Sequence, residues 1–189
     1  METKKYSKSI NGFEYSGDIT IKLAEGDRIY SEQHYHNTGC RTLFNFFSNC
    51  LAGDFNAAKS SRPCKIVLFK AGDGEQLGTF NSSYWTDEYR ISSGMYYDSA
   101  VTPGMEEGKC ETTFHFRLPF LALNGGTTVS KLGLYPDIIS FYDTDLCAYK
   151  FLDRPIEIPE KSGNYTIIID WTLKVTNINS TESNQSNNN

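Results

Sequence analysis

A strict alternation of apolar and polar residues near the C-terminus constrains the fold more than any other feature of the chain. In GNYTIIIDWTLKVTN, residues 163–177, every second side chain from Tyr165 to Val175 is apolar, and the side chains between them are mostly polar. Because successive side chains of a β-strand point to opposite faces, this pattern predicts a long strand with one face in a core. Such a strand needs a second layer on which to pack.

A second segment, ETTFHFRLPFLAL at residues 111–123, alternates in the same way. Its Pro119 lacks a backbone N–H, which predicts a sheet edge or a bend at that point. Shorter strand signals occur at residues 18–35, 64–70, 127–135 and 145–152. Together they predict a mainly β fold, an antiparallel, jelly-roll-like β-sandwich of about seven to nine strands. We expect residues 111–122 and 164–177 to form the two longest strands.

One segment has helical periodicity instead. The apolar side chains at positions 43, 46, 47, 50 and 51 fall on a single stripe, which predicts an amphipathic helix near residues 38–52. Asn37 or Thr38 is the expected N-terminal cap, and Gly53 the expected left-handed C-terminal residue. We expect this helix to cover an open end or edge of the sandwich. Residues 56–63 are expected to be a loop and 71–78 a glycine-rich turn, and residues 79–103 a long loop or loosely paired strands.

The two ends of the chain differ in composition from its middle. Residues 1–17 and the Asn- and Ser-rich residues 178–189 contain few apolar side chains, so neither can build a core of its own. The predicted organisation is an N-terminal arm over residues 1–17, a β-sandwich domain over 18–177 and a polar tail over 178–189. Polar arms of this kind bind neighbouring subunits in symmetric assemblies.

The pair His34 and His36 raises the question of a metal site. Two residues apart on a strand, both side chains point to the same face, but a metal needs at least a third ligand. In a cupin the pattern continues with a glutamate, whereas here Asn37-Thr38-Gly39 follows and a helix begins. We therefore expect no metal and no cofactor, with the histidines at a strand end. A cupin-like metal enzyme is kept as a second alternative.

Residues 82–98, SSYWTDEYRISSGMYYD, form an aromatic segment rich in Tyr and Trp. Exposed rings of this kind serve protein partners or sugars as stacking surfaces, but the same rings can also cover the ends of a sandwich. The predicted interface combines this segment with the N-terminal arm, and its residues are Tyr84, Trp85, Tyr89, Tyr96, Tyr97, Tyr6, Phe13 and Tyr15.

Several classes of function are disfavoured. The formal net charge of −5 argues against binding to a phosphate backbone, so no nucleic-acid partner is expected. No apolar run reaches membrane-spanning length, and the polar N-terminus does not resemble a secretory signal. The five cysteines include no CxxC pair and are expected to be reduced thiols. No nucleophile elbow, P-loop or dinucleotide fingerprint is present, so no catalytic residues are predicted.

The order of these features resembles a family. HNTG leads into the helical LFNFFSNCLAGDF, followed by RPCKIVLF, VSKLGLY, LCAYKFLDRPIEI and the terminal IIIDWTLKVTN. Over residues 27–177 this order is similar to that of accessory structural proteins of tailed bacteriophage virions, the small β-sandwich subunits of capsid decorations, collars and tails. The five cysteines and the aromatic segment depart from that pattern.

The resemblance implies a non-enzymatic virion subunit that is synthesised in the host cytoplasm. It would contact other virion proteins or copies of itself. The first alternative is a carbohydrate-binding or receptor-binding β-sandwich module, for which a glycan would be the ligand.

Overall fold

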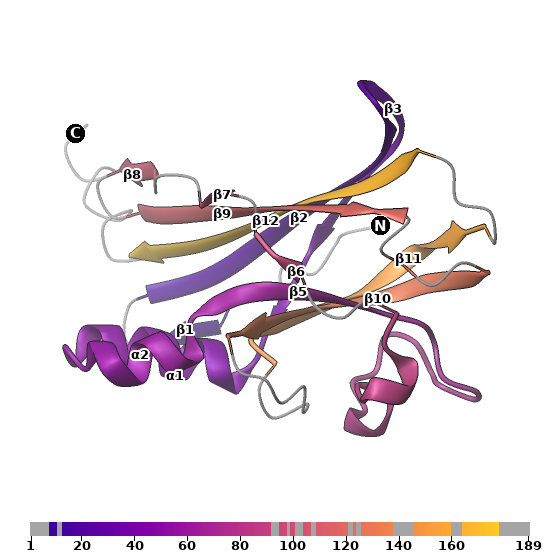
Figure 1. Cartoon of the computed structure of the whole chain (residues 1–189). Coiled ribbons are helices and arrows are strands. Elements are labelled where there is room, and N and C mark those ends of the chain that lie inside the picture. The colour runs from indigo at the N-terminus through magenta and orange to yellow at the C-terminus, as the bar shows by residue number, and fades with distance from the viewer. Residues whose placement is uncertain are drawn as a thin grey trace, which may run out of the picture.

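The chain folds as two antiparallel β-sheets packed face to face (Figure 1). The computed structural model describes residues 8–10, 13–91, 95–97, 99–100, 104–106, 109–120, 123, 126–137, 146–159 and 164–177. The mainly β fold and the antiparallel β-sandwich are confirmed. Within the described residues, seven strands have seven residues or more, and short strands extend the edges of both sheets.

The first sheet, called sheet A, is built around the C-terminal strand. Its order is β1 (Lys8–Ile10), β2 (Phe13–Glu25), β12 (Tyr165–Asn177), β9 (Lys109–Pro119) and β7 (Ser99–Ala100). In addition, β3 (Arg28–His36) pairs with β2, and β8 (Gly104–Glu106) pairs with β9. β2 runs antiparallel to β3 through a tight turn, so the strand signal at residues 18–35 corresponds to the two strands of a hairpin.

Two predictions about sheet A are wrong. β2 and β12, at 13 residues each, are the longest described strands, whereas β9 has 11. The boundary of the N-terminal arm at residue 17 also fails, because β1 and the first residues of β2 already lie in the sheet. β1 pairs with the first residues of β2, and those residues pair with the end of β12, so pairing with distant segments brings both into the sheet.

The second sheet, sheet B, has the order β4 (Thr38–Gly39), β11 (Ala148–Ile158), β10 (Thr127–Pro136), β5 (Pro63–Phe69) and β6 (Met95–Tyr96). Every residue of β5 is buried, and so are the last eight of β10. A sheet that is buried on both faces needs a layer on each side. Sheet A covers one face, and residues 70–91, with the short 3₁₀ helices η1 (Ser82–Tyr84) and η2 (Asp87–Tyr89), cover the other.

The alternation in the sequence corresponds to the core between the sheets. Ile167, Ile169 and Trp171 of β12 are fully buried, and they pack beside Phe116 and Leu118 of β9. Sheet B contributes the opposite half of this core, with Ile66, Leu68, Leu132, Leu134 and Leu152. The predicted inward-facing residues of both long strands are therefore confirmed.

The predicted helix is α1 (Arg41–Leu51), which lies with α2 (Phe55–Ser61) at one end of the sandwich (Figure 1). Leu43 enters the core with no exposed surface, and Gly53 ends the helix with φ of 74°. The predicted N-terminal caps are wrong, because the chain is still extended at Thr38 in β4 and the helix starts after Cys40 without a side-chain cap.

The second helix, α2, was expected to be a loop. Its seven residues contain too few apolar side chains for a clear periodicity, and only Ala58 is buried. The Asp54 carboxylate accepts a hydrogen bond from the Ala57 N–H at 3.0 Å, so α2 has a side-chain N-terminal cap, whereas α1 has none.

We expect Leu43→Ala to lower the free energy of unfolding by about 2–5 kcal/mol, because it removes a fully buried side chain from the core. Phe55→Ala is the matched control on the neighbouring helix, since Phe55 is 72% exposed. That substitution is expected to cost less than about 0.5 kcal/mol. Urea unfolding followed by circular dichroism measures both, and equal losses would show that α1 is not anchored through Leu43.

Candidate functional site

The outer face of sheet A brings together all three histidines of the chain. The strand register places His34 opposite Thr20, Thr20 opposite Asp170, and Asp170 opposite His115. These four side chains form one row across β3, β2, β12 and β9, and His36 lies in the next row, opposite Asp18. We call this surface the histidine face, and its residues are Asp18, Thr20, Glu32, His34, His36, His115, Asp170 and Lys174.

Each histidine contacts a carboxylate. His36 Nδ1 lies 2.6 Å from Asp18 Oδ1, and His115 Nδ1 lies 2.5 Å from Asp170 Oδ1. His34 has its Nε2 at 3.1 Å from Glu32 Oε1 and its Nδ1 at 3.1 Å from Thr20 Oγ1. Both ring nitrogens of His34 and the Nδ1 of His36 thus contact neighbours on the same face.

Asp18 links the histidine face to a lysine. Lys174 Nζ donates to Asp18 Oδ2 at 2.6 Å. Burial alone would raise the pKa of Asp18, but the hydrogen bonds and charges of Lys174 and His36 outweigh burial and lower it. The hydrogen bond to Asp18 in turn raises the pKa of Lys174. The charged forms of both groups are therefore favoured in the folded protein.

A shallow depression of about 290 Å³ lies between β2 and β3 on this face, lined by residues 18–20 and 34–36. Within the described part of the chain, no three His, Cys, Asp or Glu side chains converge as metal ligands. The cupin-like alternative required a third ligand beside His34 and His36, and the structure brings none of the described residues into that position.

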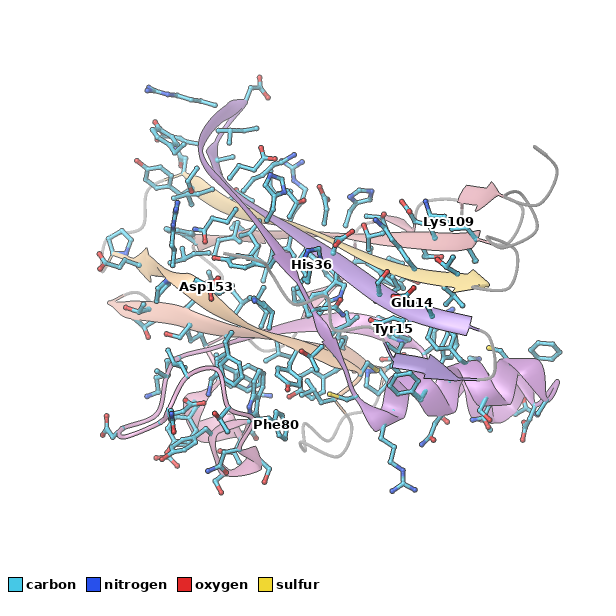
Figure 2. The ribbon with its side chains drawn as sticks, turned by 180° about the vertical axis from the view of Figure 1, so that it is seen from behind. Glu14, Tyr15, His36, Phe80, Lys109 and Asp153 are labelled. Atoms are coloured by element: carbon cyan, nitrogen blue, oxygen red, sulfur yellow. The ribbon has the colours of Figure 1, made fainter. Side chains whose placement is uncertain are left out.

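β3 is exposed along most of its length. Of the nine residues of β3, only Tyr35 is buried and only Gln33 is half-buried. Among the described strands, β3 pairs with β2 alone, so its other edge faces away from the sheet. Figure 1 shows the hairpin of β2 and β3 projecting beyond the rest of the sandwich, and Figure 2 labels His36 on β3.

The backbone hydrogen bonds identify which groups of β3 point outward. The N–H of Asn37 donates to Gly17 O at 3.0 Å, in register with the β2–β3 ladder. In an antiparallel ladder, residues that bond to the partner strand alternate with residues that do not. The backbone N–H and C=O groups of Gln33 and Tyr35 therefore point toward β2. The same groups of Glu32, His34 and His36 point toward the free edge.

The base of β3 is anchored in the core. Asn37 Nδ2 donates to Tyr15 Oη at 2.9 Å, and Tyr15 is only 7% exposed. Gly17 is required there, because a Cβ at that position would lie 1.8 Å from Asn37 Oδ1. Tyr15 also packs edge-on against Phe44 of α1, with 5.9 Å between the ring centroids. The prediction that Tyr15 belongs to an exposed arm interface is wrong, because β2 begins earlier than expected.

The aromatic segment has a role different from the expected one. Trp85 has no exposed surface, and its ring centroid lies 5.1 Å from that of Phe69 and 5.7 Å from that of Phe151. The prediction of Trp85 as an exposed interface residue is wrong, since it fills the layer over the outer face of sheet B. A sugar cannot stack on it, and Phe80, which lies below sheet B in Figure 2 and is 38% exposed, covers its ring.

A buried lysine fixes this aromatic layer. Lys131 Nζ donates to both carboxylate oxygens of Glu75, at 2.9 and 2.8 Å, and to Tyr84 O at 2.7 Å. The Lys131 and Glu75 side chains are 0% and 1% exposed. The Lys131 ammonium lies 5.1 to 6.0 Å from the centroids of four rings, which are those of Phe69, Tyr84, Trp85 and Tyr89.

Burial lowers the pKa of Lys131, and the hydrogen bond to Glu75 only partly offsets this effect. Tyr84 and Tyr89 are half-buried, so each has only part of its surface available for the predicted interface. Their rings contact each other at 5.5 Å and close the layer beside Gly72, where a Cβ would meet Tyr84 at 2.2 Å. No local sequence pattern indicates this arrangement, because Glu75 and Lys131 are 56 residues apart.

The remaining predicted interface residues are only partly described. Tyr97 is half-buried and packs on Phe114, with 5.5 Å between the ring centroids. Phe13 and Tyr96 lie in β2 and β6, but their side chains lie outside the described part of the structure. Tyr6 and the tail over 178–189 lie outside the described residues altogether, so their predicted roles stay predictions.

Two of the cysteines are poorly suited to nucleophilic chemistry. Burial raises the pKa of Cys40 to about 12 and that of Cys64 to about 11. Because the thiolate is the reactive form, both groups are almost entirely unreactive at neutral pH. Cys147 is buried too, and its thiol donates to Ser61 O at 3.7 Å.

The α-helices that the structure describes, of 11 and 7 residues, are too short to cross a membrane. Comparisons with protein-family models, with curated proteins and with solved structures found no match.

We expect Asp18→Asn to lower the free energy of unfolding at pH 7 by about 0.5–1 kcal/mol, as for a partly exposed ion pair. A lowered carboxyl pKa contributes stability above the unfolded value and loses it as the pH falls through the folded one. The ion pair also needs a charged Lys174, whose pKa is raised. Its stabilisation is therefore lost on the alkaline side only when the pH rises through the folded pKa of the lysine. The difference between wild type and variant should thus narrow below about pH 4. A constant difference in urea unfolding from pH 7 to pH 3 would contradict this assignment.

Lys131→Met should cost about 3–5 kcal/mol, because it leaves the Glu75 carboxylate buried without its partner. The double variant Lys131→Met with Glu75→Gln should recover part of that loss, since no unpaired charge remains. Lys22→Met, on the outer face of β2, is the control and should change stability by less than about 0.5 kcal/mol. Chemical unfolding of the wild type, the single variants Lys131→Met and Glu75→Gln and the double variant completes the cycle, and additive losses would show that the pair is not coupled.

Proposed function

We propose that this protein is a non-enzymatic structural subunit that joins a larger assembly through the free edge of β3. The observation that carries the proposal is the outward direction of the N–H and C=O groups of Glu32, His34 and His36 on a strand exposed along nearly its whole length. A free edge of this kind accepts a strand from a partner by main-chain pairing.

The contrast with the edge of sheet B supports the proposal. β4 pairs with β11 only at Ala148 and Tyr149, so the rest of β11 also lies along an edge. That stretch carries Pro155 and the exposed Asp153 and Arg154, which are residues that discourage pairing at an edge. β3 contains no proline, and its bulge lies at the hairpin end, beside Tyr30, while Arg28 and Glu32 are its charged residues. From Ser31 to His36 every outward N–H is therefore available to a partner strand, whereas β11 contains a proline.

The chemistry of the rest of the chain fits a structural role. The aromatic layer over sheet B is used internally, the Cys40 and Cys64 thiols are held protonated, and the histidines bond to neighbouring side chains. Together with the resemblance to accessory proteins of tailed bacteriophage virions, these features favour a virion subunit made in the host cytoplasm. Its partners would be other virion proteins or copies of itself.

The test is incorporation into particles. We expect mass spectrometry of virions purified from the phage that encodes this chain to detect it at a fixed ratio to the major capsid protein. His34→Pro removes one outward N–H and should reduce incorporation at least about tenfold, the loss expected for about 1.4 kcal/mol.

His34→Ala is the matched control, because it removes the ring but keeps the backbone donor. It should be incorporated nearly as well as the wild type, and circular dichroism should show both variants folded. Absence of the chain from purified virions would refute the virion assignment. Normal incorporation of the proline variant would refute the role of the β3 edge.

A further inference from the structure

We propose that the partner of β3 is β3 of a second copy, paired antiparallel about a two-fold axis that passes beside Gln33. This inference rests on the proposed function, because it names the partner of the same edge. It would join sheet A of two copies into one continuous sheet, with both histidine faces on the same side.

The backbone permits this pairing. The outward-facing residues Glu32, His34 and His36 all have even numbers, whereas Gln33 and Tyr35 bond inward to β2. In a two-fold antiparallel pair centred on Gln33, Glu32 faces His34 of the second copy, and both residues have their N–H and C=O groups in the interface. Such a pair exchanges two backbone hydrogen bonds, and the axis repeats it.

Charge selects this register among the possible ones. Centring the pair on Glu32 would place two carboxylates directly opposite each other, which is unfavourable in a sheet. Centring it on His34 would place two histidines, and no carboxylate, opposite each other at the axis. The register on Gln33 instead places a Glu–His pair on each side of the axis, with a ladder that extends from Ser31 to Tyr35, because the bulge at Tyr30 interrupts the regular alternation.

Disulfide trapping tests the pairing and its register together. In a Cys110→Ser background, which removes an exposed native thiol, Gln33→Cys places two thiols across the axis. Their Cα atoms would be about 4.5–5.5 Å apart, within the range of a disulfide. Ser31→Cys is the control on the same strand, and its two copies would be about 13 Å apart, too far to join.

We expect mild oxidation to produce a covalent dimer of the Gln33→Cys protein and little or none of the Ser31→Cys protein, as seen on a non-reducing gel. Because so short an edge contact is expected to be weak, the reaction is run at several protein concentrations. Dimer formation by Ser31→Cys instead would refute the register. Dimer formation by neither protein would refute self-pairing.

A charge exchange provides a second test that needs no cysteine. Glu32→Lys should weaken dimerisation in analytical ultracentrifugation, and Glu32→Lys with His34→Glu should restore it, since each lysine then faces a glutamate. Failure of the double variant to restore association would contradict the pairing.

The outcome also separates this inference from the proposed function. If His34→Pro is lost from virions while Gln33→Cys forms no dimer, the edge binds a strand of another protein, and only self-pairing is refuted. If the dimer forms and the chain is absent from virions, self-pairing stands and the virion role falls.

Discussion

The ladder between β2 and β12 is the interaction on which the rest of the structure depends. The two strands pair over 13 residues, from Tyr165 opposite Glu25 to Asn177 opposite Phe13. β9 extends the ladder on the other side of β12, and β3 extends it on the other side of β2. Because register decides which side chains face the core, this one pairing fixes both the apolar interior and the polar outer face of sheet A.

The same register builds the histidine face and leaves the β3 edge open. His34, Thr20, Asp170 and His115 come from four strands and meet only because those strands align. A one-residue slip of any of these strands would turn its side chain in this row toward the core. The anchor of Tyr15, Gly17 and Asn37 prevents such a slip at the base of β3, because the Asn37 side chain fits only above a glycine. The base of β3 is thereby fixed to β2 and to the core.

The second face of sheet B is covered by an irregular layer formed by residues 70–91. The ion pair of Lys131 and Glu75, and the aromatic rings around the Lys131 ammonium group, hold this layer in place. A buried ion pair adds little net stability compared with an apolar core, but breaking one partner is costly. The pair therefore selects one position for a segment that has little regular secondary structure of its own.

The sequence by itself determined the fold class, the inward faces of β9 and β12, and the stripe and C-terminus of α1. These features depend on local periodicity and on the conformational freedom of Gly53, which neighbouring residues alone express. Only the tertiary structure decided the burial of Trp85 and Tyr15, the pairing of Lys131 with Glu75, and the exposure of β3. Each of these features depends on contacts between segments far apart in the chain. The exposure of β3 depends on the absence of a described strand on its outer side. The mixed polar sequence of β3 does not indicate whether the strand lies at the edge or in the middle of a sheet. Its free edge therefore follows only from the positions of the other strands.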